Sequence, residues 1–291
     1  MKDIDGYHVL RKGAIVDVMS TARCNLRCKH CYLPYKGEIE ASELLDLVNN
    51  LRGDYDVRIN GAEPLLNRGY LAAFEANDYD TVLTNGLVFW NNFDYIDELV
   101  KRGIKIFRIS YHFDMSEQFD SVEKEYLLEL FKEIAKRGGQ VKIGATITAK
   151  NYKKVPEYCE FCVKNGIKMI KFTNYIRQGR AKGLDDDLVL NDAQLQEFFD
   201  IIGEERRKYD KEVLLVERCG SFGPNWKNPE RFQCGAGIDG LALTPDYKVF
   251  PCIFLTESEY QIGFYRDGKI FVRDDYKPCM DRCLAKDIFN N

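Results

Sequence analysis

Short apolar runs alternate, over the first two-thirds of the chain, with segments whose apolar residues recur every three or four positions. The apolar runs predict strands and the periodic segments predict amphipathic helices. Strands are predicted at residues 14–19, 57–60, 81–83, 104–110, 141–148 and 169–173. Helices are predicted at residues 41–51, 70–76, 95–101, 122–136 and 155–164.

The alternation of strands and helices predicts consecutive βαβ units and therefore a parallel sheet. Gly103, Gly138 and Gly166 each follow a predicted helix, where a glycine suits a left-handed cap. The chain holds about six such units, fewer than the eight of a closed barrel. We therefore predict the α/β class, with a partial (β/α)6 TIM-like barrel over residues 1–185.

The remaining residues, 186–291, predict a connecting helix and a small α+β domain. A helix is expected at 191–208, a strand at 213–217, and a further helix at 281–289. From Cys219 onward glycine, proline and cysteine become frequent and long helical periodicity is lost. A segment of about 70 residues rarely builds a sufficient core alone, so we expect metal-bound thiols to stabilise it.

Composition excludes some classes of partner. The 291 residues carry a net charge of −4 with acids and bases interspersed, which is not the electrostatic footprint of a nucleic-acid-binding protein. The sequence shows no apolar signal segment and no long apolar run, so no membrane partner is expected. Ten cysteines in such a chain favour metal binding or catalysis over disulfides, and predict a cytoplasmic location.

Cys24, Cys28 and Cys31 are spaced C-x3-C-x2-C. A loop this short can hold three corners of a cubane iron–sulfur cluster, and because it supplies no fourth thiol, one iron stays open to an outside ligand. The alternative is a zinc knuckle. Zinc takes four ligands, and His30 would have to be the fourth.

This loop, with the aromatic Tyr32 directly after it, resembles the radical SAM superfamily. The resemblance implies a [4Fe–4S] cluster whose open iron binds S-adenosylmethionine (SAM), and a reductant such as flavodoxin or ferredoxin. It implies that SAM is cleaved to methionine and a 5′-deoxyadenosyl radical, and that Tyr32 packs near the adenine.

Two further motifs are similar to those of the same superfamily. Residues 60–64 resemble the "GGEP" stretch that binds the methionine amino group, which implies SAM contacts from Gly61, Ala62 and Glu63. Ala62 departs from the usual second glycine. Asn85 lies in a Thr-Asn-Gly stretch that resembles the family's "TNG". Both stretches are also ordinary turn signals.

Single residues at or after predicted strand ends also resemble positions of the radical SAM superfamily. Ser110 matches a position that commonly contacts the SAM ribose or carboxylate, and a helix or strand cap is the alternative. Arg180 lies in a "GRA" turn and is expected to face SAM or substrate, unless it is simply exposed. Cys159 and Cys162 form a C-x2-C on a predicted helix, where core packing is expected.

The last quarter resembles the SPASM/twitch extension of radical SAM enzymes. A predicted hairpin between Cys234 and Cys252 is similar to its cysteine-flanked hairpin, with Tyr247 in place of the usual turn glycine. The resemblance implies one auxiliary [4Fe–4S] cluster held by Cys234, Cys252, Cys279 and Cys283. Zinc suits four thiolates equally well and stays the alternative.

Cys219 remains outside that set. It is a candidate hydrogen-atom donor to a substrate radical, an alternative cluster ligand, or a buried inert thiol. A hydrogen donor would imply epimerisation, whereas an auxiliary cluster that accepts electrons would imply dehydrogenation or cross-linking.

The leading hypothesis is thus a radical SAM enzyme that modifies a peptide or protein side chain. The cysteine loop begins at residue 24, and we expect no leader-binding domain before it. The alternative substrate is a small molecule such as an aminoglycoside-like sugar or a nucleoside. A hypothesis of another class is a non-catalytic iron–sulfur carrier or zinc-stabilised binding module.

Overall fold

The computed structural model describes residues 4–74, 79–112, 123–184, 186–209, 213–216 and 235–277. They form two compact units, which are described separately. Unit 1 contains the described residues among 4–25, 33–80 and 235–277. Unit 2 contains those among 26–32 and 81–216.

Unit 1 is built on a seven-stranded mixed sheet with the order β1-β12-β11-β10-β9-β2-β3. Its elements are β1 (Tyr7–Val9), β2 (Ile15–Met19), α1 (Ala41–Leu51), β3 (Asp56–Asn60), α2 (Tyr70–Phe74), β9 (Gly240–Leu243), β10 (Lys248–Phe250), β11 (Gly263–Arg266) and β12 (Lys269–Arg273). Strand β2 pairs in parallel with both β3 and β9. The C-terminal strands therefore extend the sheet that the N-terminal strands begin.

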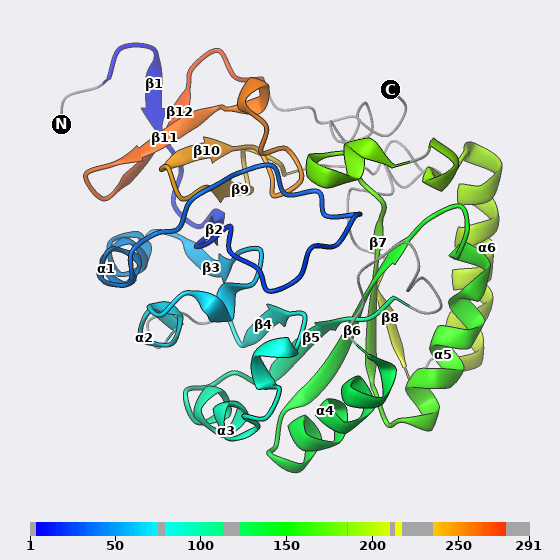
Figure 1. Cartoon of the computed structure of the whole chain (residues 1–291). Helices are drawn as coiled ribbons and strands as arrows, with labels where there is room; N and C mark the ends of the chain where they lie inside the picture. Colours follow the sequence, from blue (N-terminus) through cyan, green and yellow to red (C-terminus); the bar gives the residue numbers. More distant parts are fainter. Residues whose placement is uncertain are drawn as a thin grey trace. The chain divides into compact units, whose positions relative to one another are not determined.

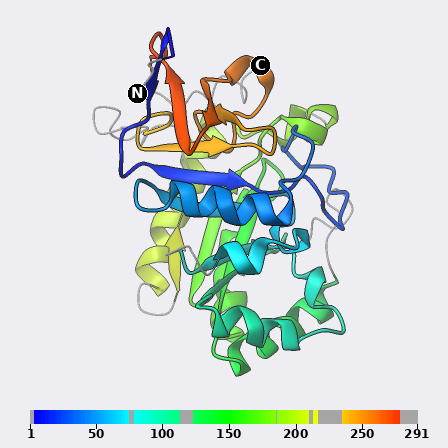
Figure 2. The ribbon, with the colours of Figure 1, turned by 90° about the vertical axis from the view of Figure 1, so that its left-hand side faces the viewer.

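Strand β2 and helix α1 of unit 1 each bury one apolar side. Val16 and Val18 point to one face of β2 and are fully buried. Helix α1 presents Leu44 and Val48 from one side, and both are fully buried. Figure 2 shows α1 running alongside β2.

Unit 2 is built on a five-stranded parallel sheet in sequence order, β4-β5-β6-β7-β8. Its elements are β4 (Thr81–Thr84), α3 (Asp94–Lys101), β5 (Ile106–Ser110), α4 (Lys124–Lys136), β6 (Gln140–Ile147), α5 (Val155–Lys164), β7 (Met169–Asn174), α6 (Asp192–Tyr209) and β8 (Leu214–Val216). One α-helix separates each strand from the next, which is the predicted βαβ succession (Figure 1).

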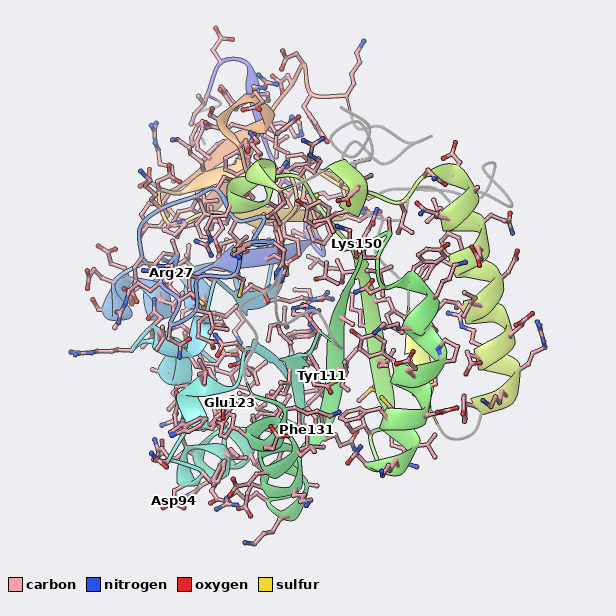
Figure 3. All side chains as sticks on the ribbon, turned by 45° about the vertical axis from the view of Figure 1, so that its right-hand side comes forward. Arg27, Asp94, Tyr111, Glu123, Phe131 and Lys150 are labelled. Carbon is pink, nitrogen blue, oxygen red and sulfur yellow. The ribbon has the colours of Figure 1, made fainter. Side chains whose placement is uncertain are left out.

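Aromatic side chains hold the helices of unit 2 on the sheet. Tyr111, directly after β5, stacks on Phe161 of α5 with ring centroids 4.9 Å apart. Its ring also meets Phe131 of α4 edge-on at 6.4 Å, and the two are labelled in Figure 3. Phe172 of β7 meets Phe198 of α6 in the same edge-on manner. Such pairs stabilise by about 0.5–1.5 kcal/mol beyond the area they bury.

The six strands predicted over the first two-thirds of the chain are present as β2–β7, the strand expected at 213–217 is present as β8, and the α/β class is confirmed. They belong to two sheets, with β2 and β3 in unit 1 and β4–β7 in unit 2, so the partial barrel stays a prediction. The domain boundary between residues 185 and 186 also stays a prediction. The helix expected at 281–289 lies outside the described residues.

Within the described part of the chain, no helix combines the length and the apolar character needed to cross a membrane.

Candidate metal centre and cosubstrate site

Cys28 and Cys31 lie in one tight turn of unit 2. The backbone N–H of Cys31 donates a hydrogen bond to the Cys28 carbonyl over 3.2 Å. Both side chains remain thiols and are half-buried. Cys24, in unit 1, is also a half-buried thiol. The turn brings two of the predicted ligands into neighbouring positions, which the C-x2-C spacing requires.

Arg180, which is distant in sequence, stabilises this turn with two hydrogen bonds. Its Nε donates to the Cys28 carbonyl over 3.0 Å, and its backbone N–H donates to the Cys31 carbonyl over 3.0 Å. Arg180 lies on the short 3-10 helix Gly179–Gly183, and its side chain is exposed. The structure therefore gives Arg180 a positioning contact with the cysteine turn, which the "GRA" resemblance did not predict.

His30, between the two thiols, packs edge-on against His112 with ring centroids 4.6 Å apart. Burial, then the neighbouring His112 and Arg180, lower the pKa of His30, and burial lowers the pKa of His112 to about 4. Both rings are therefore neutral near pH 7. Across the described ranges, no three His, Cys, Asp or Glu side chains are grouped so that they could hold a single metal ion.

The stretch that resembles "GGEP" is tied to the residues just before Cys24, all within unit 1. Ala62 N–H donates to the Thr21 carbonyl over 2.8 Å, and Glu63 N–H donates to the Arg23 carbonyl over 3.0 Å. A Cβ added to Gly61 would lie 2.9 Å from the Thr21 carbonyl oxygen. The missing side chain of Gly61 thus makes room for the neighbouring backbone.

The carboxylate of Glu63 is buried and has a local partner. Its Oε1 accepts a hydrogen bond from Leu65 N–H over 3.4 Å, at the start of the 3-10 helix Pro64–Leu66. Glu63 thereby caps this helix, which fixes where its carboxylate lies.

Asn67 is a residue that the sequence did not single out. Its Nδ2 donates to the carbonyls of Ser20 at 3.2 Å and Ile39 at 2.8 Å, and its Oδ1 accepts from Gly69 N–H at 2.8 Å. Asn67 is buried, with 2% of its surface exposed. The only local signal is the turn composition of Asn67-Arg68-Gly69, because its main partners are distant in sequence.

The Thr-Asn-Gly stretch is a hydrogen-bonded turn in unit 2. Thr84 Oγ1 accepts from Gly86 N–H over 3.0 Å, and Asn85 Oδ1 accepts from Leu87 N–H over 2.9 Å. Tyr126 from α4 donates its hydroxyl to the Gly86 carbonyl over 2.7 Å. The turn is thus specified by its own side chains and by α4.

The other predicted residues are placed as follows. Ser110 ends β5 and is exposed, and Tyr32 is half-buried. Cys252, a half-buried thiol, comes soon after β10. Four cysteines lie outside the described residues: Cys219, Cys234, Cys279 and Cys283.

Cys159 and Cys162 have the surroundings expected of core residues. Both are fully buried thiols on α5. Burial, followed by the nearby charge of Glu205, raises the pKa of Cys159 to about 12. Burial also raises the pKa of Cys162. Neutral thiols of this kind are inert towards metals and oxidants.

Comparison with known sequences identifies several relatives. No family model matches the chain. It is 29% identical over 286 residues to a GTP 3′,8-cyclase of Aliarcobacter butzleri, spanning 88% of this chain and 84% of that protein. It is also 29% identical over 193 residues to a pre-heme d1 synthase of Dinoroseobacter shibae, spanning 57% of this chain and 45% of that protein.

Solved structures share the fold at lower sequence identity. The Streptococcus suis protein SuiB bound to S-adenosylmethionine matches with a TM-score of 0.69 and 17% identity, over 87% of this chain and 63% of SuiB. The chain thus spans less than two-thirds of SuiB. Native anSMEcpe, with bound AdoMet and the Cp18Cys peptide, matches with a TM-score of 0.63 and 15% identity, over 86% of this chain and 76% of that one.

These relatives and structural neighbours are radical SAM enzymes, whose cofactors are a [4Fe–4S] cluster and SAM. The C-x3-C-x2-C loop, the strand–helix succession and the sequence similarity over 88% of the chain agree, and the chain resembles radical SAM enzymes.

Proposed function

We propose that Cys24, Cys28 and Cys31 hold a [4Fe–4S] cluster with one open iron, and that the enzyme uses it with SAM to remove a hydrogen atom from substrate. The observation that carries the proposal is the C-x3-C-x2-C loop, together with the hydrogen bond that Arg180 donates to the Cys28 carbonyl in its turn. Arg180 holds the turn through the backbone carbonyls of Cys28 and Cys31.

The cysteines of the loop fit a [4Fe–4S] cluster chemically. Fe–S clusters are held by thiolates, and the loop supplies three thiols within eight residues of continuous chain. When bound, the cluster and SAM would supply one-electron reductive cleavage of a sulfonium, which generates the radical that abstracts a hydrogen atom. The part of the protein is to orient the reacting C–H bond and to keep water away from it.

SAM contacts are proposed for six residues on the grounds given by the resemblance. The buried carboxylate of Glu63 suits an ammonium group, because charge-assisted hydrogen bonds are strong where water is excluded. The exposed hydroxyl of Ser110 suits the ribose or carboxylate. The others are Tyr32, Gly61, Ala62 and Asn85.

A second [4Fe–4S] cluster is proposed for the C-terminal segment. Cys252, at the end of the β9–β10 hairpin, would share it with Cys234, Cys279 and Cys283. Such a cluster would accept electrons from the substrate radical, whereas Cys219 as a hydrogen donor would lead to epimerisation. Replacing Cys219 by alanine distinguishes these roles. Loss of product with iron content unchanged indicates a donor, and loss of iron indicates a ligand.

For the substrate we propose a small molecule rather than the peptide favoured by the sequence. The relative called GTP 3′,8-cyclase is similar to the chain over 88% of its length. The structural neighbours solved with a bound peptide share the fold at 15–17% identity, which carries no argument about substrate.

The test is to reconstitute the protein with iron and sulfide without oxygen, and then to add dithionite and SAM. We expect bound iron and sulfide, and release of 5′-deoxyadenosine. The Cys28→Ala variant should release none, and Cys159→Ala, a cysteine outside the loop, should still release it. Stoichiometric zinc in place of iron, with no SAM cleavage, would refute the proposal in favour of a binding module.

A further inference from the structure

One face of the sheet of unit 1 carries polar residues where β2 and β3 pair. Asp17 on β2 is in register with Arg58 on β3, and Met19 is in register with Asn60. Register partners project to the same face, and so do residues two positions apart on one strand. All four side chains therefore share one face of the sheet, where a carboxylate interrupts an otherwise apolar strand.

The same face continues as an apolar surface on β9 and β10. Ala242 on β9 is in register with Asp17, and Phe250 on β10 is in register with Ala242. Met19, Ala242 and Phe250 form a buried cluster. The partly buried side chains packed against this cluster are Leu33, Tyr35, Ile253 and Tyr260. A mostly apolar surface with a few polar groups at fixed positions is the usual composition of a small-molecule site.

Asn60 is fixed in this face through both its side chain and its backbone. Its Nδ2 donates to Oδ1 of Asp17 over 2.6 Å. Because a carboxylate only accepts hydrogen bonds, this contact determines which end of the amide faces Asp17. The carbonyl of Asn60 accepts from both the N–H and the hydroxyl of Ser20, each over 2.8 Å. The amide is thus held in one orientation by its neighbours.

The other end of this amide is a buried acceptor. Asn60 is 7% exposed, and no described residue donates a hydrogen bond to its Oδ1. Arg58 donates elsewhere, to Asp56 over 2.9 Å, and its guanidinium lies 4.9 Å from the ring centroid of Tyr79. Buried polar atoms are nearly always paired, because an unpaired one costs free energy. An acceptor of this kind is suited to a donor that arrives with a ligand.

We propose that the small-molecule substrate donates a hydrogen bond from an amino group to Oδ1 of Asn60, with the carboxylate of Asp17 beside it. An acceptor next to a carboxylate favours a donor that carries positive charge, because charge-assisted hydrogen bonds are the stronger kind. Asp17 is half-buried, so a ligand reaches the pair from its side. This inference rests on the proposed function and adds the chemical class of the substrate, a small molecule with a protonated amine.

The position of Asn60 suits this role. Asn60 is the last residue of β3, and Met19 is the last residue of β2. Sites form at the carboxyl ends of strands in parallel α/β architectures. Residues 61–63, for which SAM contacts are proposed, follow Asn60 directly. SAM carries an amino group of its own, so the experiment must separate the substrate from the cosubstrate.

The test measures the binding of propylammonium to the reconstituted protein with SAM bound, by calorimetry at fixed ionic strength. Asn60→Leu should bind propylammonium at least tenfold more weakly than the wild type, because it removes the acceptor. The control Asn50→Leu, at an exposed position on α1, should leave the affinity unchanged. Trimethylpropylammonium keeps the charge but has no N–H, and it should bind equally to the wild type and to Asn60→Leu.

Two further ligands identify the group that Asn60 binds. Propan-1-ol offers a hydroxyl donor without charge, and wild-type affinity for it equal to that for propylammonium would overturn the assignment to an amine. SAM should bind equally to the wild type and to Asn60→Leu. Weaker SAM binding in Asn60→Leu, with propylammonium affinity unchanged, would assign Asn60 to the cosubstrate and overturn the inference.

An exchange of the two residues separates a binding role from a structural one. Asn60→Asp combined with Asp17→Asn restores a hydrogen bond between an amide and a carboxylate, and it keeps an acceptor at the end of β3. It should regain most of the propylammonium affinity that Asn60→Leu loses. A melting temperature that falls in Asn60→Leu and recovers in the exchange, with one propylammonium affinity in all three proteins, would show a structural role only and overturn the inference.

The single variant Asp17→Asn keeps the test decisive if Asn60→Leu does not fold. It retains Asn60 and removes only the neighbouring negative charge, so it should bind propylammonium more weakly than the wild type. Equal affinity of Asp17→Asn and the wild type would contradict a charge-assisted site.

The outcome is separable from that of the proposed function. Failure of the wild type to cleave SAM would refute the radical SAM mechanism while leaving an amine site defined by Asn60 intact. SAM cleavage by the wild type, together with amine binding that is indifferent to Asn60 and Asp17, would refute only the amine site.

Discussion

The Thr-Asn-Gly turn makes a quantitative prediction about Gly86. Its φ of +86° lies in the left-handed region, where an L side chain costs about 1–2 kcal/mol. A Cβ added there would also lie 2.6 Å from Cδ2 of the fully buried Leu130. Overpacking of this kind costs about 1–3 kcal/mol, so Gly86→Ala should lower the free energy of unfolding of unit 2 by about 2–5 kcal/mol.

Gly138 offers a matched control in the same unit. Its φ is +84°, yet a Cβ there would meet nothing within 4 Å. Gly138→Ala should therefore cost only the backbone term, about 1–2 kcal/mol. The difference between the two variants isolates the contact with Leu130.

The assay is equilibrium urea unfolding followed by the fluorescence of Trp90, which packs on Tyr126 with ring centroids 4.5 Å apart. The chain has two tryptophans, so Trp226→Phe makes Trp90 the single reporter. In the double variant Gly86→Ala/Leu130→Ala, removal of the clash should make the loss smaller than the sum of the single losses by about 1–3 kcal/mol. Equal losses for Gly86→Ala and Gly138→Ala, with additivity in the double variant, would refute the reasoning.

Three further predictions concern hydrogen bonds around the site. Asn67→Ala should lower the free energy of unfolding, measured by urea titration, by about 2–4 kcal/mol, because it breaks three buried hydrogen bonds. In the same titration the control Asn50→Ala, at an exposed position, should change it by less than about 0.5 kcal/mol. Arg180→Met should release iron to a colorimetric chelator faster than the wild type, because the cysteine turn loses its side-chain anchor; an unchanged rate would show that this anchor is dispensable. Tyr126→Phe should cost about 1–2 kcal/mol in thermal or urea unfolding through its lost bond to Gly86, and a neutral effect would contradict a direct hydrogen bond.

The spacing of apolar residues along the chain was sufficient to predict the elements in which those residues recur regularly. Helices α1 and α5 begin and end at the predicted residues, 41–51 and 155–164. Strands β11 and β12 were not predicted, although Asp267-Gly268 between them is a strong hairpin signal and both residues have positive φ. The parallel pairing of β9 with β2 could not be predicted, because it joins segments separated by more than two hundred residues.

In the candidate site, too, the features formed by neighbours in the chain could be predicted, and the contacts between residues distant in sequence could not. The cysteine spacing shows in the sequence because its ligands are neighbours in the chain. The contact of Arg180 with Cys28 joins residues 152 positions apart, and no local pattern indicates it. The hydrogen bond between Asn60 and Asp17 likewise appears only once the strands are paired, although an acid inside the apolar run at residues 14–19 was a visible signal.

The measurement that tests the central claim most directly is the electron paramagnetic resonance spectrum of the dithionite-reduced, reconstituted protein with and without SAM. An open iron beside Cys24, Cys28 and Cys31 predicts a reduced-cluster signal that changes when SAM is added and is absent from Cys28→Ala. A wild-type spectrum that is the same with and without SAM, or a protein that binds no iron, would contradict the account.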